Sequence, residues 1–200
     1  MTFVRQKDRF RSNRKEDMKW EDYTAKFEDI LEGRHTDSPY DKADYLEYAK
    51  LNNSRTNRWM KRGELTEETK QALASISTPQ KWILITEHWC GDAANTGPFI
   101  KKMVDQNSNL ELEIQLRDSG SEIDNYLTNG GKAVPKLIVR DEEGNDLFTW
   151  GARPSEAAAL VIAHKESDLD AKTKKAELQK WYNSDKGVSV QQEITSLLSR

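Results

Sequence analysis

The chain has 200 residues, of which 36% are hydrophobic and 32% charged, with a formal net charge of −3 and one cysteine. This length favours one domain with additions or two small domains. The polar composition predicts one compact core with exposed, charge-rich helices. The small net charge argues against a nucleic-acid footprint over the whole chain. No apolar run approaches the roughly 18 residues of a membrane span, and one cysteine cannot form an internal disulfide.

Residues 1–19 are predicted to form a basic flexible arm. They carry seven Lys or Arg against three Asp or Glu, and few apolar residues interrupt them. Such a composition is typical of a solvated chain end, with a phosphate or nucleic-acid tether as the alternative. The arm has no apolar core like that of a signal peptide, so we expect no secretory signal and a cytoplasmic location.

Residues 20–78 are predicted to form an N-terminal extension of three helices. The first, over residues 20–33, places apolar residues at helical spacing: Tyr23, Phe27, Ile30 and Leu31. The second is expected to begin with Ser38 as N-cap and Pro39 at the first helical position, and to end at Gly63. Thr66 is the predicted N-cap of the third helix.

The pattern changes at Pro79, where strands begin to alternate with helices. A short apolar run over residues 81–89 predicts a buried strand, residues 91–106 a helix, and residues 110–118 a half-buried strand. Residues 121–128 indicate a short helix, and Gly130 and Gly131 then break the chain. Residues 135–151 predict a hairpin with a solvated acidic turn at 141–143. A helix capped by Ser155 follows. The order β-α-β-α-β-β-α predicts an α/β fold.

Residues 166–200 are predicted to form a C-terminal helical extension. Ser167 is the expected N-cap of one helix, and residues 185–187 break the chain. Ser189 and Gln192 have the spacing of a capping box for the last helix. We expect both extensions to pack on the core through aromatic side chains, with a dimer or partner surface as the alternative. The aromatic side chains in question are Trp20, Tyr45, Trp59, Trp181 and Tyr182.

Several landmarks between residues 80 and 165 lie at characteristic spacings. The motif WCGDA contains Cys90, and Pro98 follows eight positions later within the predicted helix. The motif AVPKLIV contains Val134 and Pro135, and Gly151 follows sixteen positions after that proline. These features resemble the thioredoxin family, with its Trp-Cys-Gly-Pro-Cys motif and its cis-proline strand. The resemblance implies a thioredoxin-like domain over residues 79–165, with a central mixed sheet flanked by helices and a cis bond before Pro135.

The chain departs from this family pattern at three positions. Ala93 stands where the family has its second cysteine, and Asp92 where it has the intervening proline. Leu84 stands where the family often has a buried acid that moves protons. A dithiol cycle needs a second thiol to release the mixed disulfide. The resemblance therefore implies a single-cysteine member without ordinary thioredoxin activity.

Cys90 is the candidate catalytic residue. The N-terminus of a helix favours a thiolate and lowers the pKa of a cysteine placed there. Asp92 in the first turn opposes this effect, and Glu87 is close in sequence. His88 either offsets these carboxylates as an imidazolium or points to solvent. The alternative is that Cys90 is a small buried hydrophobic side chain without chemistry.

Trp89, Val134 and Pro135 are the candidate substrate-binding residues. In the resembled family, the backbone before the cis-proline pairs with an extended substrate peptide beside the cysteine. The resemblance therefore implies a shallow groove bounded by these three residues and Cys90, which binds peptide by strand addition. Trp89 either shields the site or contacts a partner.

No metal or cofactor is predicted, because His35, His88 and His164 are widely spaced and form no ligand pattern with Cys90. One hypothesis is monothiol thiol–disulfide exchange in cell redox homeostasis, through a mixed disulfide with glutathione or a protein thiol. Another is a non-catalytic module that binds peptides or proteins. A third is another thiol use, such as peroxide reduction through a sulfenic acid or shared metal-cluster ligation in a dimer. No nucleic-acid or membrane partner is expected, and oligomeric state and enzymatic activity stay open.

Overall fold

A four-stranded mixed sheet forms the centre of the protein, in the order β2-β1-β3-β4. The strands are β1 (Gln80–Thr86), β2 (Leu110–Leu116), β3 (Lys136–Arg140) and β4 (Asp146–Gly151). β1 pairs parallel with β2, and the other two neighbouring pairs are antiparallel. The computed structural model describes residues 18–199, so the predicted arm lies outside the described residues except for Met18 and Lys19. The predicted α/β fold with a mixed sheet is confirmed.

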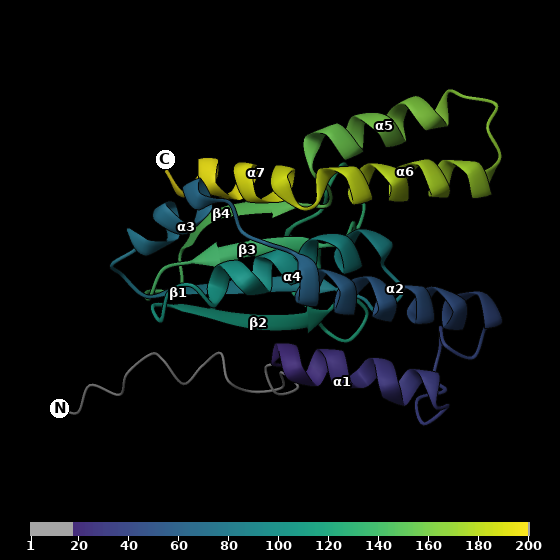
Figure 1. Ribbon diagram of the computed structural model, residues 1–200. Helices are drawn as coiled ribbons and strands as arrows, with labels where there is room; N and C mark the ends of the chain where they lie inside the picture. The colour runs from purple at the N-terminus through teal and green to yellow at the C-terminus, as the bar shows by residue number, and fades with distance from the viewer. Residues whose placement is uncertain (1–17, 200) are drawn as a thin grey trace.

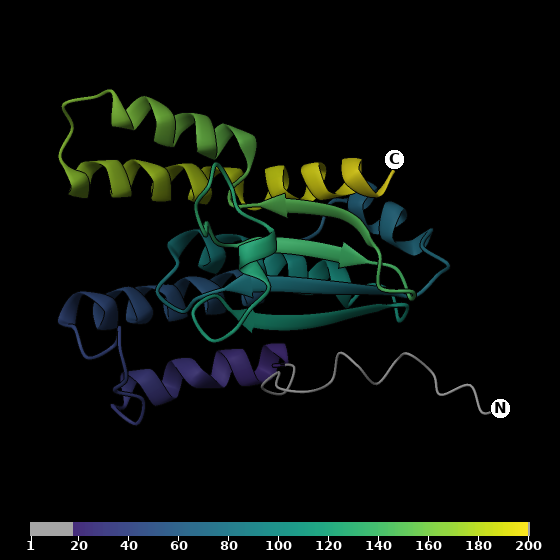
Figure 2. The ribbon, with the colours of Figure 1, turned by 180° about the vertical axis from the view of Figure 1, so that it is seen from behind.

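Helices cover one face of this sheet more fully than the other. Those described are α1 (Trp20–Leu31), α2 (Ala43–Arg62), α3 (Glu67–Ala74), α4 (Gly91–Val104), α5 (Ser155–Lys165), α6 (Ala171–Asp185) and α7 (Val188–Leu198). Figure 1 shows α4 across the front of the sheet, with α2, α3 and α7 around it. Seen from behind in Figure 2, the opposite face is crossed by the loop that carries the short 3-10 turn η2 (Ile123–Asn125). No helix within residues 18–199 has the length and apolarity that a membrane span requires.

The central strand β1 is buried on both faces. Successive strand residues point to opposite faces of a sheet. Trp82 and Leu84 therefore join the main core, which also contains Phe99 of α4. Ile83 and Ile85 point the other way and join a smaller apolar cluster. Burial on both faces explains why β1 is a continuous apolar run instead of an alternating one.

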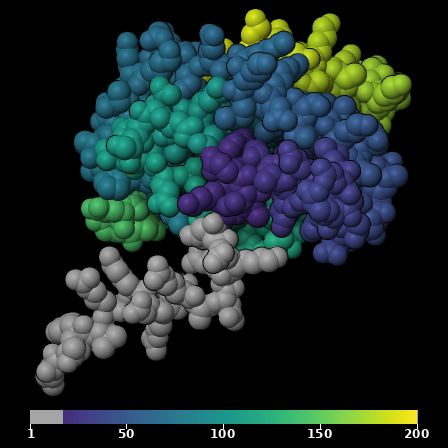
Figure 3. Space-filling model, turned by 60° about the horizontal axis from the view of Figure 1, so that its bottom comes forward, coloured from purple at the N-terminus to yellow at the C-terminus, as the bar shows by residue number. Residues whose placement is uncertain are grey.

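The helical extensions pack on the core through their aromatic residues. Trp20, Trp59 and Tyr182 are buried, and the first two belong to the main core. Figure 3 shows α1, in purple, packed between the blue segment that contains α2 and the teal segment that contains α4. Met18 forms an isolated bridge with Ile114, so the chain before α1 covers the outer edge of β2. Covering an edge strand hides backbone groups that would otherwise pair with another chain.

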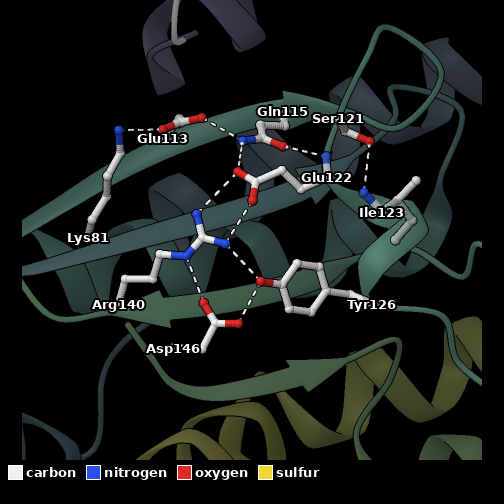
Figure 4. Close-up of polar contacts among 9 residues, drawn as sticks. All are labelled: Lys81, Glu113, Gln115, Ser121, Glu122, Ile123, Tyr126, Arg140 and Asp146. Carbon is white, nitrogen blue, oxygen red and sulfur yellow. Dashed lines mark hydrogen bonds and ion pairs between the residues drawn. The ribbon is translucent and has the colours of Figure 1, made fainter. Parts of the chain in front are cut away.

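A polar network fastens the η2 loop to the face of the sheet that α4 does not cover (Figure 4). The Arg140 guanidinium donates to Glu122 and Tyr126 at 2.7 Å each, and its Nε donates to Asp146 at 2.7 Å. The Gln115 amide also donates to Glu122, at 3.1 Å. A guanidinium held by two carboxylates in a half-buried site contributes more than an isolated surface pair. This network positions the chain that leads to Val134.

Of three helix predictions before residue 130, one is confirmed and two differ from the structure. The predicted cap at Thr66 is confirmed, because its hydroxyl accepts the Thr69 N–H at 3.2 Å. The predicted start of α2 at Ser38 is wrong, because residues 38–42 form tight turns in which the Tyr40 N–H bonds to Asp37. The predicted short helix over residues 121–128 is reduced to the single turn η2.

The three predicted serine caps in the C-terminal half are also wrong. Ser155 is the first residue of α5, and both its N–H and its hydroxyl donate to Glu193 of α7. α6 is capped not by Ser167 but by Asp170, whose carboxylate accepts two backbone N–H groups. Ser189 donates to a carboxylate in the last turn of α6. In each case a carboxylate, which is the stronger acceptor, replaces the serine hydroxyl.

Gly187 is expected to tolerate no side chain. It separates α6 from α7 with φ +78°, and a Cβ atom there would lie 2.3 Å from the Phe99 ring. We predict that Gly187→Ala lowers the free energy of unfolding by about 3 kcal/mol, through left-handed strain plus overpacking. The matched control is Gly120→Ala, because Gly120 has φ +85° and no atom near the Cβ position. It should cost only about 1 kcal/mol. Equal losses in urea denaturation would contradict the packing argument.

Candidate functional site

Cys90 lies at the turn between β1 and α4, on the side of the sheet that faces the η2 loop. It is the N-cap of α4, and its sulfur accepts the Ala93 N–H at 3.5 Å. The thiol donates to the carbonyl of Val134 at 3.3 Å. Cys90 is buried in the smaller apolar cluster with Ile83, Ile85, Ile123 and others. The thiol therefore acts as a packed, hydrogen-bonded side chain that joins α4 to the segment before β3.

The thiol is held in its protonated form. Burial, followed by the charge of the nearby Asp92 carboxylate, raises the pKa of Cys90 to about 12. The backbone N–H groups of Ala93 and Asp92, and then the charge of Arg153, act in the opposite direction. The helix N-terminus therefore acts in the expected direction, but it does not lower the net pKa of Cys90 in this conformation. Desolvation in an apolar cluster outweighs the partial charge of the helix end.

Asp92 joins three segments that are distant in sequence. Its carboxylate forms an ion pair with Arg153 at 2.7 Å and accepts the Tyr182 hydroxyl at 2.9 Å. Arg153 lies just before α5, and Tyr182 belongs to α6. Burial raises the pKa of Asp92, while Arg153 and Tyr182 lower it. The predicted effect of Asp92 on the thiol is confirmed in its direction, whereas nothing in the local sequence marked Arg153 as its partner.

His88 cannot offset these carboxylates. Its ring stacks on Tyr23, with centroids 4.4 Å apart, and packs edge-on against Phe27. Its Nε2 atom lies 2.9 Å from the carbonyl oxygen of Tyr23. Burial lowers the pKa of His88 to about 4, so the ring is neutral at physiological pH. The alternatives of an imidazolium that offsets the carboxylates and of a ring that points to solvent are therefore both wrong, because α1 encloses the ring.

Glu87 is a buried carboxyl beside this turn. Its Oε1 atom accepts the Asp118 N–H at 3.0 Å. Burial raises the pKa of Glu87 to about 7. The neighbouring Arg117 guanidinium lies over the Trp89 ring, 4.6 Å from its centroid. Glu87 therefore changes charge near neutral pH, next to a cation that packs on Trp89.

The residues of the expected groove are largely covered. The Val134–Pro135 bond is cis. Cys90, Val134 and Pro135 are buried, and only Trp89 is half-exposed. The Val134 carbonyl already accepts the thiol hydrogen bond. The structure brings the four residues to one place but does not leave them open for strand addition.

An open cavity lies beside them instead, between α2 and α6. It has a volume of about 670 Å³, and Trp89, Gly91 and Asp92 form one end of it. In Figure 1, α2 and α6 run on either side of the N-terminal end of α4. The sequence did not indicate this cavity, because its walls come from both extensions.

The histidines, the acidic turn at 141–143 and the glycine pair, which the sequence analysis also considered, have structural roles. Within residues 18–199, no three His, Cys, Asp or Glu side chains gather as a metal site would require. Asp141 bonds to Asn145 through both backbone and side chain, which forms the hairpin turn. Gly131 pairs with Thr128 in an isolated bridge before β3. None of these groups adds chemistry near Cys90.

Comparison with known proteins identifies a family model and solved structures that match this chain. A family model described as thioredoxin matches residues 39–172. A Pseudomonas aeruginosa protein of unknown function is 16% identical, with a TM-score of 0.52, and covers 79% of this chain and 86% of its own. An HIV epitope scaffold is 18% identical, with a TM-score of 0.52, and covers 88% of this chain and 90% of its own. At these identities both likenesses show the fold alone. No curated protein matches significantly.

Glu87 and His88 should impose opposite pH dependences on stability. The pKa of His88 is lowered, so its contribution to stability is lost as pH falls from about 6.5 towards 4. The pKa of Glu87 is raised, so its contribution is present at low pH and lost as pH rises through about 7. Relative to wild type, Glu87→Gln should therefore gain on the order of 3 kcal/mol between pH 4.5 and 8. Urea denaturation at both pH values measures this difference, and a constant difference would contradict it.

Asp92→Asn should lower the pKa of Cys90. The substitution removes the carboxylate charge that opposes a thiolate and leaves the Arg153 cation in place. We expect a decrease of roughly one unit or more, as for removal of a nearby like charge. A pH titration of thiolate absorbance in the ultraviolet measures it, with Cys90→Ala as the blank. An unchanged or higher midpoint would show that Asp92 does not act on the thiol.

Proposed function

The chain belongs to the thioredoxin family, and from this premise we propose that it acts by binding, without a thiol–disulfide cycle at Cys90. The observation that carries the proposal is the state of the thiol, which is buried and has its pKa raised to about 12. The thiolate is the nucleophile in disulfide exchange, and such a thiol is almost wholly protonated at neutral pH. The sequence also contains no second cysteine that would release a mixed disulfide.

In this role Cys90 maintains the shape of the binding surface. Its hydrogen bond to Val134 links the start of α4 to the cis-proline segment. Trp89 remains half-exposed, with Arg117 over its ring and Tyr45 edge-on at 6.1 Å. Large aromatic side chains beside an arginine are typical of the residues that dominate protein–protein contacts. A protein or peptide that binds at Trp89 needs no reaction at the thiol.

Monothiol exchange is the second candidate function. The feature that favours it is the position of the sulfur at the N-terminus of α4, where it already accepts the Ala93 N–H. In this reaction the Cys90 thiolate attacks the glutathione sulfur of a protein–glutathione mixed disulfide, forms its own mixed disulfide with glutathione and releases the protein thiolate. A free glutathione thiolate then attacks the glutathione sulfur of this mixed disulfide, which regenerates the Cys90 thiolate and forms glutathione disulfide. This function requires a conformation in which the thiol leaves Val134 and reaches solvent.

Alkylation by iodoacetamide, followed from pH 4 to 10, separates the two functions. If the thiol is structural, folded protein should react about a thousandfold more slowly than glutathione near pH 8, because its pKa is raised from 9.0 to about 12. In urea the rate should approach that of glutathione. Cys90→Ala is the blank. A midpoint below that of glutathione, with a fast plateau in folded protein, would reject the binding proposal and favour monothiol exchange.

A further inference from the structure

The cavity between α2 and α6 has the dimensions of a ligand site. Its volume of about 670 Å³ lies within the range of small-molecule pockets. One wall comes from the N-terminal extension and the other from the C-terminal extension, with Gly91 at the start of α4 between them. The positive end of a helix dipole favours negative charge. The Asp92 and Ala93 N–H groups already act on the Cys90 sulfur, so recognition of an anion at this end of the cavity depends on side-chain charges.

Arg55 supplies a cation at that end. Its side chain lines the cavity, and a Cβ atom at Gly91 would lie 3.2 Å from its Nη1 atom, so the guanidinium packs over the first residue of α4. Nη1 donates to the Asn52 amide oxygen at 2.9 Å. No carboxylate within residues 18–199 forms an ion pair with Arg55. Asp92 acts on Arg55 electrostatically, but its direct ion pair is with Arg153. The half-buried Arg55 guanidinium can therefore form a direct ion pair with a bound carboxylate or phosphate.

The remaining charges of the cavity have the same sign. Lys175 and Lys180 line it from α6. Asp92 is the only carboxylate among the described lining residues, and it is already paired with Arg153 and Tyr182. A bound anion would therefore lie in a positive electrostatic potential, and no unpaired carboxylate of the lining would repel it.

Aromatic rings form the apolar part of the same cavity. Tyr45 lies edge-on to both Tyr48 and Trp89, with ring centroids 6.1 Å apart in each pair. The Lys175 Nζ atom lies over the Tyr48 ring, 4.7 Å from its centroid. Leu51 is half exposed in the same wall. Such rings favour a flat apolar body of a ligand.

We propose that this cavity binds a small organic anion with a flat aromatic body. Its carboxylate or phosphate lies against Arg55 and the start of α4, and its ring lies against Tyr45, Tyr48 and Trp89. The inference goes beyond the proposed function, because it names a small-molecule site that shares Trp89 and Tyr45 with the proposed binding surface but does not involve Cys90. It also does not depend on the reactivity of the thiol.

Naphthalene-1-acetate and naphthalene-1-acetamide test this inference, because they share a ring and differ in charge. 1-Naphthyl phosphate distinguishes a phosphate from a carboxylate preference. Binding is measured by titration calorimetry and by amide shifts in nitrogen-15 NMR spectra of the full chain. We expect at least one anion to saturate, with the amide binding about tenfold or more weakly. Shifts should cluster in α2, α6 and the first turn of α4.

Substitution of single charged residues identifies the side chains that bind the anion. Arg55→Gln should weaken anion binding about tenfold, and Lys175→Gln, at an exposed position, several-fold. Arg34→Gln is the control, because Arg34 pairs with Asp29 outside the cavity. Absence of saturation by both anions, equal affinity for the amide, or insensitivity to both cavity variants would overturn the inference. A reactive thiol with intact anion binding would reject only the proposed function.

Discussion

A carboxylate buried in a protein is stable as an ion only when neighbouring groups replace its hydration, and Asp92 is held in this way by Arg153 and Tyr182. These partners come from the loop before α5 and from α6. One interaction therefore fixes the C-terminal extension against the start of α4. The same contact places a negative charge beside Cys90 and aligns α6 along the cavity that α2 completes.

Burial determines the charge of the turn between β1 and α4. It raises the pKa of Glu87 and Cys90 and lowers that of His88, so each group is shifted towards its neutral form. An uncharged turn can pack under α1 and the η2 loop without unpaired ions. The helix N-terminus acts on the thiol in the opposite direction but is the weaker influence. A charged group contacts an aromatic ring beside this turn, where the Arg117 guanidinium packs over the half-exposed Trp89 ring.

The sequence predicted those features that depend on neighbours along the chain. Three such features follow from local periodicity and residue type: the sequence of the four strands along the chain, the position of Cys90 at the start of α4, and the cap at Thr66. The serine caps failed for a different reason. Ser155 has a good capping side chain, but the folded chain offers it Glu193 from α7, which is a stronger acceptor. Local propensity cannot account for an acceptor almost forty residues away.

By itself the sequence determined that the protein has one thiol, that no second cysteine can complete an internal dithiol cycle, and that the core alternates strands with helices in a thioredoxin-like order. Only the tertiary structure decided the protonation of that thiol and the place of the open cavity. Desolvation depends on which side chains pack around a group in space, and those that bury Cys90, such as Ile83, Ile123 and Val134, come from segments outside the motif. The cavity likewise takes its walls from both extensions. The chemistry of Cys90 is therefore a property of the packed chain and not of WCGDA alone.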